Sequence, residues 1–267
     1  MYIIGKDFYD FQIKKKNKMN CTWKSTSECL KLFKSIQHTN TMINVAFSTD
    51  GLSIMSMDTS KTSLVKLILT AGYFDNYQCT CPMVFGIYTE VLTNVLQKAK
   101  GVVVTWKATD TNDMTIVMTN DTVVTEIRLR SIDIEDDQLN IPELEDDIAL
   151  IVPTTVLRDW FDKVQMTKGD VAFDITRGQF VCSSESIEVG EIKHTEPIGG
   201  ERIQLSTFRN DVNIALSFNS ARSLVVFAGC GDTCFVGFSN QQPSRIQVNL
   251  DETSVLSLYV APKIMDD

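Results

Sequence analysis

Residues of the kinds that carry chemistry are few in this chain, and they form no known catalytic pattern. The two histidines, His38 and His194, lie in no recognised nucleophile or metal-binding setting. The glycines at 199–200 and at 229 and 231 lack the preceding strand and following helix that a phosphate-binding loop requires. We therefore expect no catalytic residues, no cofactor and no enzymatic activity.

Two cysteine pairs have spacings that zinc ligands can have. Cys79 and Cys81 form one pair, and Cys230 and Cys234 form the other. A structural zinc site needs four thiolates on converging elements, yet these pairs fall in unrelated strand-like segments. The odd total of seven cysteines also fits reduced thiols. The carboxylates of 133–137 would suit a divalent cation, but an exposed acidic connector explains them more simply, so we expect no bound metal.

A stronger signal comes from basic side chains on the polar faces of expected helices. They are Lys31, Lys34, Lys98, Arg158, Lys163 and Arg222. Only Asp159 and Asp162 oppose them, so these faces carry a charge of +4 in a chain whose net charge is −9. One such face is usually just a solvated surface. Four related helices with the same bias favour a shared surface that contacts phosphate groups.

Four amphipathic helices are expected to position these side chains, because an apolar quartet recurs at regular intervals. Each quartet has the spacing i, i+3, i+4, i+7 of a buried helix face, and the first members are 63, 65 and 64 residues apart. The quartets are Cys29/Leu32/Phe33/Ile36, Leu92/Val95/Leu96/Ala99, Leu157/Trp160/Phe161/Val164 and Ala221/Leu224/Val225/Ala228. The even spacing indicates a copied unit of one helix and several strands, which would place equivalent faces on one surface.

The two halves of the chain repeat each other as well. The tripeptide VAF at 45–47 recurs at 171–173, an offset of 126 residues. We expect helices over 25–38, 89–100, 153–166 and 218–228, with strands between them. The pattern predicts an α+β fold of two similar domains with mainly antiparallel sheets. The predicted segments are an N-terminal extension at 1–18, a first domain at 19–131, an acidic connector at 132–147, a second domain at 148–264 and a tail at 265–267.

Composition excludes several classes of protein. Hydrophobic residues make up 43% of the chain and charged residues 22%, which is typical of globular domains. No apolar run approaches the roughly 20 residues of a membrane span, and the N-terminus does not resemble a secretory signal. We therefore expect an intracellular protein with no membrane partner. The net charge of −9 argues against a protein that simply coats nucleic acid, but it permits one whose basic residues share a face.

The acidic connector contains an apolar centre. Eight of the sixteen residues at 132–147 are Asp or Glu and none is basic, so we expect this segment to be extended and exposed. Leu139, Ile141 and Pro142 interrupt the acidic run. Apolar residues in such a place either lie on an apolar surface or await a partner.

Three motifs give the chain a resemblance to the proliferating cell nuclear antigen family. The segment SMDTS at 56–60, followed by SLV at 63–65, resembles that family's S-M-D-S-S…S-L-V. LNIPE at 139–143 resembles its interdomain L-G-I-P-E, and YVAPKI at 259–264 resembles its C-terminal Y-L-A-P-K-I. The motifs occur in the family's order and spacing, and the match covers 19–267. The chain is thus identified as a divergent member of that family. We expect it to come from a large DNA virus or a protist.

The resemblance implies the DNA clamp fold and a homotrimeric ring with its helices around the hole. It implies double-stranded DNA as a sequence-independent partner, together with a DNA polymerase, a clamp loader and proteins that carry the family's interaction peptide. The location implied is the nucleus, or a cytoplasmic replication site for a viral protein. The residues expected to face DNA are Lys24, Lys31, Lys34, Lys98, Lys100, Arg158, Lys163 and Arg222.

The resemblance also implies a pocket for the interaction peptide beside the connector. The residues expected there are Met57, Lys61, Leu64, Leu139, Ile141, Pro142, Pro243, Tyr259, Ala261 and Pro262. One departure is Asp146, which stands where the family has a tyrosine, and it predicts a shallower pocket. The alternative function is a monomeric or dimeric processivity or scaffold protein of the same fold, which needs no closed oligomer.

Overall fold

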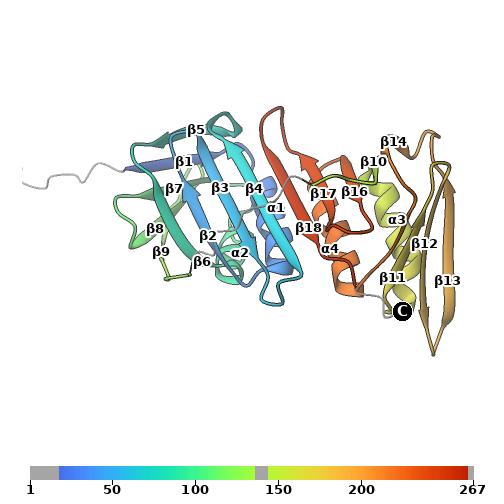
Figure 1. The fold of residues 1–267 in the computed structure, drawn as a ribbon. Helices are drawn as coiled ribbons and strands as arrows, with labels where there is room; N and C mark the ends of the chain where they lie inside the picture. The colour runs from blue at the N-terminus through green and yellow to red at the C-terminus, as the bar shows by residue number, and fades with distance from the viewer. Residues whose placement is uncertain (1–17, 136–143, 264–267) are drawn as a thin grey trace, which may run out of the picture.

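The computed structural model describes residues 18–135 and 144–263, which fold into four α-helices and eighteen β-strands (Figure 1). The helices are α1 Thr26–Thr39, α2 Thr89–Gln97, α3 Thr154–Val164 and α4 Phe218–Ala228, with two short 3-10 turns, η1 Ala71–Tyr73 and η2 Gln165–Thr167. The strands of the first half are β1 Met19–Trp23, β2 Met42–Phe47, β3 Gly51–Met57, β4 Ser63–Thr70, β5 Phe74–Cys79, β6 Met83–Tyr88, β7 Val103–Ala108, β8 Asp113–Thr119 and β9 Val124–Arg130. Those of the second half are β10 Ile148–Pro153, β11 Val171–Ile175, β12 Gln179–Ser186, β13 Gly190–Pro197, β14 Gln204–Phe208, β15 Val212–Leu216, β16 Thr233–Phe238, β17 Ser244–Asn249 and β18 Val255–Val260.

The strands form three antiparallel sheets whose order repeats. One sheet has the order β5-β1-β7-β8-β9 and another the order β13-β12-β11-β15. The third has nine strands in the order β14-β10-β16-β17-β18-β4-β3-β2-β6. Its first five strands repeat the order of the five-stranded sheet, and its last four repeat that of the four-stranded sheet. The pairing of β18 with β4 therefore joins the two halves into one continuous sheet, and the predicted α+β fold is confirmed.

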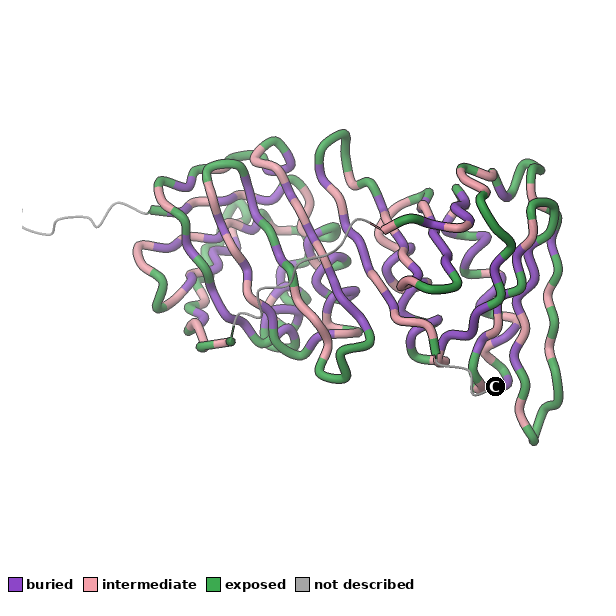
Figure 2. Tube along the Cα trace, viewed as in Figure 1, coloured by how far each residue is buried: buried purple, intermediate pink, exposed green. Residues whose placement is uncertain are grey.

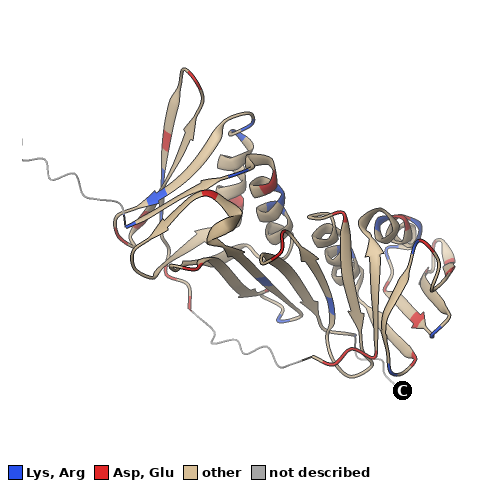
Figure 3. Ribbon diagram, turned by 90° about the horizontal axis from the view of Figure 1, so that it is seen from above, with Lys and Arg blue, Asp and Glu red and all other residues tan. Residues whose placement is uncertain are grey.

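The four helices lie side by side on one side of the sheets (Figure 3). Helix α1 contacts α2 and α4, and α4 contacts α3, so the row runs α2-α1-α4-α3. Side-chain caps begin two of them, because the hydroxyl of Ser25 accepts from the backbone N–H of Glu28 and that of Ser217 from Ser220, each at 3.2 Å. None of the helices within 18–135 and 144–263 is long and apolar enough to cross a membrane.

Each half buries an aromatic core of its own beneath the helices, and buried positions alternate along the strands (Figure 2). In the first half the rings of Trp23 and Trp106 lie 5.1 Å apart and Phe33 of α1 lies 5.4 Å from Trp106. In the second half Trp160 of α3 stacks on Phe180 at 3.9 Å. The predicted apolar quartets supply these helix residues, as periodicity requires.

Some element boundaries differ from the sequence prediction. Alternation in the sequence predicts a strand at 186–193, whereas β13 covers 190–197, and it predicts no strand at the positions of β1, β5 and β6. Helix α2 ends at Gln97 rather than residue 100, because the N–H groups of Lys98 and Ala99 bond only three residues back, to Val95 and Leu96, before the chain turns away at Gly101 (φ 73°). The predicted extension up to residue 17, the connector residues Leu139, Ile141 and Pro142, and the predicted tail at 265–267 lie outside the described residues.

Candidate nucleic-acid interface and docking surface

The helix row carries a basic cluster where the two halves meet. Lys31 and Lys34 are exposed on α1, and Arg222 is exposed on the neighbouring helix α4. Partial burial, together with the nearby charge of Arg222, lowers the pKa of His38, so this imidazole is neutral at pH 7. Lys31, Lys34 and Arg222 thus lie on adjacent helices and are available to a polyanion.

The other predicted basic residues are more scattered. Lys98 and Lys100 are exposed just beyond the end of α2, and Arg158 is exposed on α3. The ammonium of Lys24 donates to the backbone carbonyl of Gly72 at 2.6 Å. Lys24 is therefore held at the start of α1 by η1, whereas Lys98, Lys100 and Arg158 extend the basic surface along the helix row.

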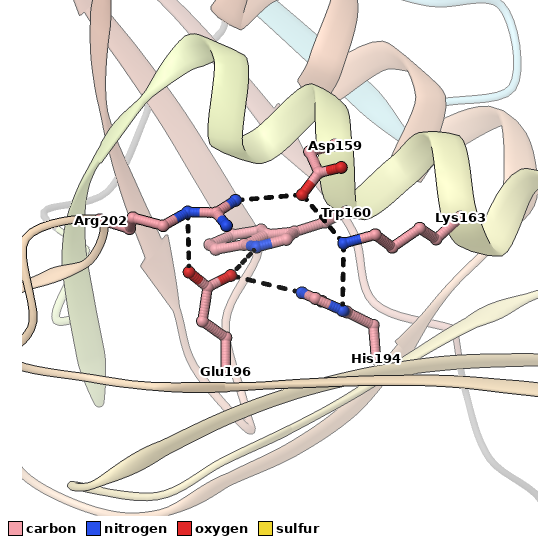
Figure 4. Close-up of polar contacts among 6 residues, drawn as sticks. All are labelled: Asp159, Trp160, Lys163, His194, Glu196 and Arg202. Carbon is pink, nitrogen blue, oxygen red and sulfur yellow. Dashed lines mark hydrogen bonds and ion pairs between the residues drawn. The ribbon is translucent and has the colours of Figure 1, made fainter.

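Lys163 on α3 lies in a polar network rather than alone (Figure 4). Its ammonium is 2.9 Å from the carboxylate of Asp159 and 3.5 Å from Nδ1 of His194 on β13. Arg202, in the loop after β13, lies 3.0 Å from Asp159 and 3.0 Å from Glu196. The carboxylates of Asp159 and Glu196 offset both cations, so Lys163 is not the unpaired cation that the sequence predicted.

The same network contains a buried hydrogen bond. The indole N–H of Trp160 donates to the carboxylate of Glu196 at 2.7 Å, and His194 Nε2 lies 3.3 Å from the same oxygen. The side chain of Glu196 is only 9% exposed. A buried carboxylate requires such partners, and the sequence prediction missed them because the residues come from a helix, a strand and a loop.

Several residues between the members of the apolar quartets, which helical spacing places on the polar helix faces, are buried. Ser35 of α1 donates to the carbonyl of Val226 of α4 at 3.3 Å, and Thr93 of α2 donates to Gln37 of α1 at 2.8 Å. Ser223 and Phe227 of α4 are buried too. The prediction was wrong for these residues because adjacent helices pack through their flanks, which removes part of each polar face from water.

The side of the nine-stranded sheet away from the helices brings the predicted pocket residues together. Met57 of β3, Leu64 of β4 and Tyr259 of β18 are successive register partners across the joint between the halves. The next partners in this row are Arg245 of β17 and Gly237 of β16. This docking row (Met57, Leu64, Tyr259, Arg245 and Gly237) is therefore a stripe across five adjacent strands.

The remaining described pocket residues lie along one side of the docking row. Ala261 donates its backbone N–H to the carbonyl of Thr62 at 2.8 Å, which places it against the turn between β3 and β4. Lys61 holds that turn with a positive φ of 57°. Pro243 precedes β17, and Pro262 follows Ala261. A cavity of about 130 Å³ opens beside Met57, with Asn44, Met55 and Ile134 among its lining.

Asp146 is where the structure corrects the expectation of a wholly exposed connector. It is 8% exposed, and its carboxylate accepts from the guanidinium of Arg245 at 2.6 and 3.2 Å. The guanidinium also lies 4.9 Å from the ring centre of Phe235. Asp146 packs so closely on Gly237 that a Cβ there would lie 2.2 Å from a carboxylate oxygen. The ion pair between Asp146 and Arg245 fixes the end of the connector over the docking row, because a buried charge needs its partner.

The cysteines are described as free thiols. Burial raises the pKa of the Cys234 thiol to about 12 and that of Cys21 well above its usual value. No group of three or more His, Cys, Asp or Glu side chains within the described ranges is arranged to hold a metal ion.

Residues 19–139 match the family model of the proliferating cell nuclear antigen N-terminal domain. Over its whole length the chain is 25% identical to the probable DNA polymerase sliding clamp 2 of Paramecium bursaria Chlorella virus 1, of which it covers 98%. The chain is therefore similar to proliferating cell nuclear antigens and DNA polymerase sliding clamps, in sequence to the family model over 19–139 and in fold over 93% of its length.

Other relatives have a similar sequence identity to the chain. The chain is 26% identical to the DNA polymerase sliding clamp of Methanothermobacter thermautotrophicus over 83% of this chain and 88% of that protein. It is 26% identical to the proliferating cell nuclear antigen of Chaetomium thermophilum over 81% of this chain and 87% of that one. The crystal structure of the Entamoeba histolytica proliferating cell nuclear antigen superposes with a TM-score of 0.84 at 20% identity, over 93% of this chain and 100% of that one, which shows a common fold.

Proposed function

We propose that this protein is a DNA sliding clamp, a closed ring of three copies that encircles duplex DNA and keeps a polymerase on its template. The observation that carries the proposal is the repeated sheet order. Within one chain β18 pairs with β4, and their equivalents, β9 and β13, are edge strands of the other two sheets. An open edge invites pairing with another strand, so β9 of one copy would pair with β13 of the next and the ring would close head to tail.

A ring explains how an acidic protein works on DNA. The row α2-α1-α4-α3 would line the hole, with Lys31, Lys34 and Arg222 facing the duplex. Contacts of this kind to phosphate carry no sequence information, and a topological link needs no tight grip. The net charge of −9 would repel DNA from the exterior. Such a protein carries out no reaction of its own, and its place is the nucleus or a viral replication site.

The docking row is the proposed site for the polymerase, the clamp loader and other replication proteins. Met57, Leu64 and Tyr259 offer apolar contacts, and the predicted connector residues Leu139, Ile141 and Pro142 would form the rim. Partners would present a short peptide with a glutamine, an aliphatic residue and two aromatic residues on one helical turn. Calorimetric titration of such a peptide tests the site: a Leu139→Ala/Ile141→Ala variant that remains trimeric but binds with unchanged affinity contradicts it.

The experiment that tests the ring uses linear DNA with both ends blocked. Protein incubated with open-ended DNA, followed by blocking of the ends, should stay on the DNA during gel filtration in 1 M salt, which screens phosphate contacts. Cutting the DNA at one internal site should then release it. Light scattering should give about three times the 30.0 kDa of the chain.

The same experiment discriminates the non-ring alternative. A monomeric or dimeric scaffold protein would leave blocked and open DNA equally in high salt, because only phosphate contacts would hold it. A particle mass of one or two chains together with equal release would contradict the proposed function.

A further inference from the structure

The two open edges carry charges that alternate along each strand. Strand β9 exposes Glu126 and Arg128, and β13 exposes Glu191 and Lys193. The Arg128 guanidinium lies 3.5 Å from the carboxylate of Asp113 on β8, but its side chain remains 72% exposed. Residues between the charged positions of each strand point the other way, since Ile127 and Ile192 are partly buried against the core. The charged side chains therefore lie on the face of each sheet that is turned away from the helices.

The internal repeat fixes which residues of the two edges correspond to the joint already present in the chain. Strand β9 is the equivalent of β18, because β9 is the fifth strand counted from β5 and β18 is the fifth strand counted from the equivalent strand β14. Val124 pairs with Thr119, the last residue of β8, and Val255 pairs with Asn249, the last residue of β17. Val124 is thus equivalent to Val255, and Thr125 to Leu256.

The second edge is aligned in the same manner. Val45 of β2 pairs with Ile54 of β3, and Ile54 pairs with Leu67 of β4. In the same way, Val171 of β11 pairs with Ser184 of β12, and Ser184 pairs with Ile192 of β13. Val45 and Val171 begin the repeated VAF tripeptide. Ile192 is thus equivalent to Leu67, whatever the lengths of the connecting turns.

The internal joint now gives a register for two copies. Leu256 lies opposite Leu67 in the pairing of β18 with β4. The equivalent antiparallel pairing sets Thr125 opposite Ile192 of the neighbouring copy. One step along, Val124 faces Lys193 and Glu126 faces Glu191.

This register makes the facing charges complementary along the diagonals. Glu126 lies one diagonal from Lys193 of the neighbouring copy, and Arg128 lies one diagonal from Glu191. Both diagonals run in the same direction, so the twist of the sheet brings both pairs together or neither. Diagonal neighbours across two strands are within reach of long side chains, and the two pairs together balance the direct opposition of Glu126 and Glu191.

We propose that this joint quartet (Glu126 and Arg128 on β9, Glu191 and Lys193 on β13) determines the register and partner choice of the joint between copies. The inference rests on the proposed ring and assigns the residues that select its subunits. The occupant of each edge is a second copy of this chain, because the quartet is complementary to itself head to tail and the same joint is already built inside the chain.

Charge reversal with rescue tests the quartet. Lys193→Glu would leave Glu126 surrounded by Glu191 and a new carboxylate, and we expect about a tenfold rise in the concentration needed for half-assembly of the trimer. Adding Glu126→Lys places a cation between the two carboxylates and should restore assembly. Analytical ultracentrifugation measures both, and circular dichroism verifies that the variants are folded.

Lys66→Glu is the matched control. Lys66 lies on β4, the equivalent of β13, and its register partners there are Met55 and Ser257, which are uncharged. The covalent chain keeps that joint together, so the trimer should be unaffected by the same change of charge.

A cross-link tests the register without charge effects. Val124→Cys with Lys193→Cys should give a covalently closed trimer under mild oxidation, because directly opposed residues lie within disulfide range. Val124→Cys with Ile192→Cys should not, since a one-residue slip turns the side chain to the other face. Three outcomes would contradict the role of the joint quartet but not the ring: the opposite cross-linking result, a trimer that is insensitive to Lys193→Glu, or a failed rescue. A monomeric wild type would overturn both.

Discussion

Helices α1 and α3 hold equivalent places in the two halves, yet their lysines have different surroundings. Lys34 of α1 is exposed, and no ion pair of its side chain is found among the described residues. Lys163 of α3 lies against Asp159 and His194, and Arg202 completes the network (Figure 4). The two helices therefore bury corresponding faces, whereas their exposed faces differ in charge.

This difference predicts an uneven interior for the proposed ring. The cations of α1 are available to phosphate, whereas those near α3 are already paired with carboxylates. A cation that must leave a carboxylate gains less from a phosphate contact, because part of the Coulomb energy is only exchanged. We expect the duplex to be held chiefly by the first half and by Arg222 at the joint.

The largest expected effect comes from reversing the charges on α1. Lys31→Glu/Lys34→Glu should weaken DNA binding at low salt roughly a hundredfold and reduce the salt dependence, because several phosphate contacts are lost in each ring. Polymerase stimulation on primed DNA should fall with it. Fluorescence anisotropy over a salt series measures the affinity, and unchanged low-salt binding would show that the α1 face was wrongly assigned.

A single-charge comparison then sharpens this result. Lys34→Gln should lower the affinity severalfold, whereas Lys163→Gln should change it less than twofold. Equal effects of the two neutralisations would contradict the difference between α1 and α3.

The two halves should also differ in how their tryptophans contribute to stability. Trp160→Phe removes the hydrogen bond to the buried Glu196, and we expect a loss of about 2 kcal/mol in the free energy of unfolding. Trp106→Phe should cost about 1 kcal/mol, because the indole N–H of Trp106 has no hydrogen-bond partner among the described residues. Urea denaturation measures both, and a larger effect of Trp106→Phe would reverse the comparison.

A gain of function should follow when α3 is made to resemble α1. Asp159→Asn removes the carboxylate that both Lys163 and Arg202 contact. With these cations released, we expect DNA affinity at low salt to rise about twofold. Asp162→Asn provides the matched control, because it removes an equal charge from the same helix but leaves the network intact. Equal gains from the two variants would point to net charge alone.

The smallest effect concerns pH. Hydrogen bonds from Lys163 and Arg202 hold the pKa of Asp159 below its usual value. A carboxyl with a depressed pKa contributes stability above its unfolded pKa of about 4 and loses it as pH falls through the lower folded value. NMR titration of the carboxyl should therefore show a midpoint below 4, and the midpoint should rise toward 4 in Arg202→Ala. An unchanged midpoint in that variant would remove Arg202 from the network.

Much of the fold follows from the sequence, because its signals are local. Helix periodicity repeats within eight residues, so the quartets that include Phe33, Leu96, Trp160 and Leu224 identified all four helices and their common face. The repeated VAF tripeptide indicated two related halves, and the motifs near Met57 and Tyr259 indicated the family. The short strand β1, in contrast, gives too few alternating residues to be recognised without its neighbours β5 and β7.

The tertiary structure alone decided which polar groups meet. Asp146 and Arg245 are 99 residues apart in the chain, and Lys163 and His194 are 31 apart, yet each pair is in contact. The sequence placed Asp146 in an exposed acidic run and Lys163 on an open basic face. Strand register and helix packing determine which residues meet over such long sequence separations, and both depend on the whole sheet. Local periodicity therefore determined the helices and their buried faces, whereas long-range pairing determined which charges remain available for function.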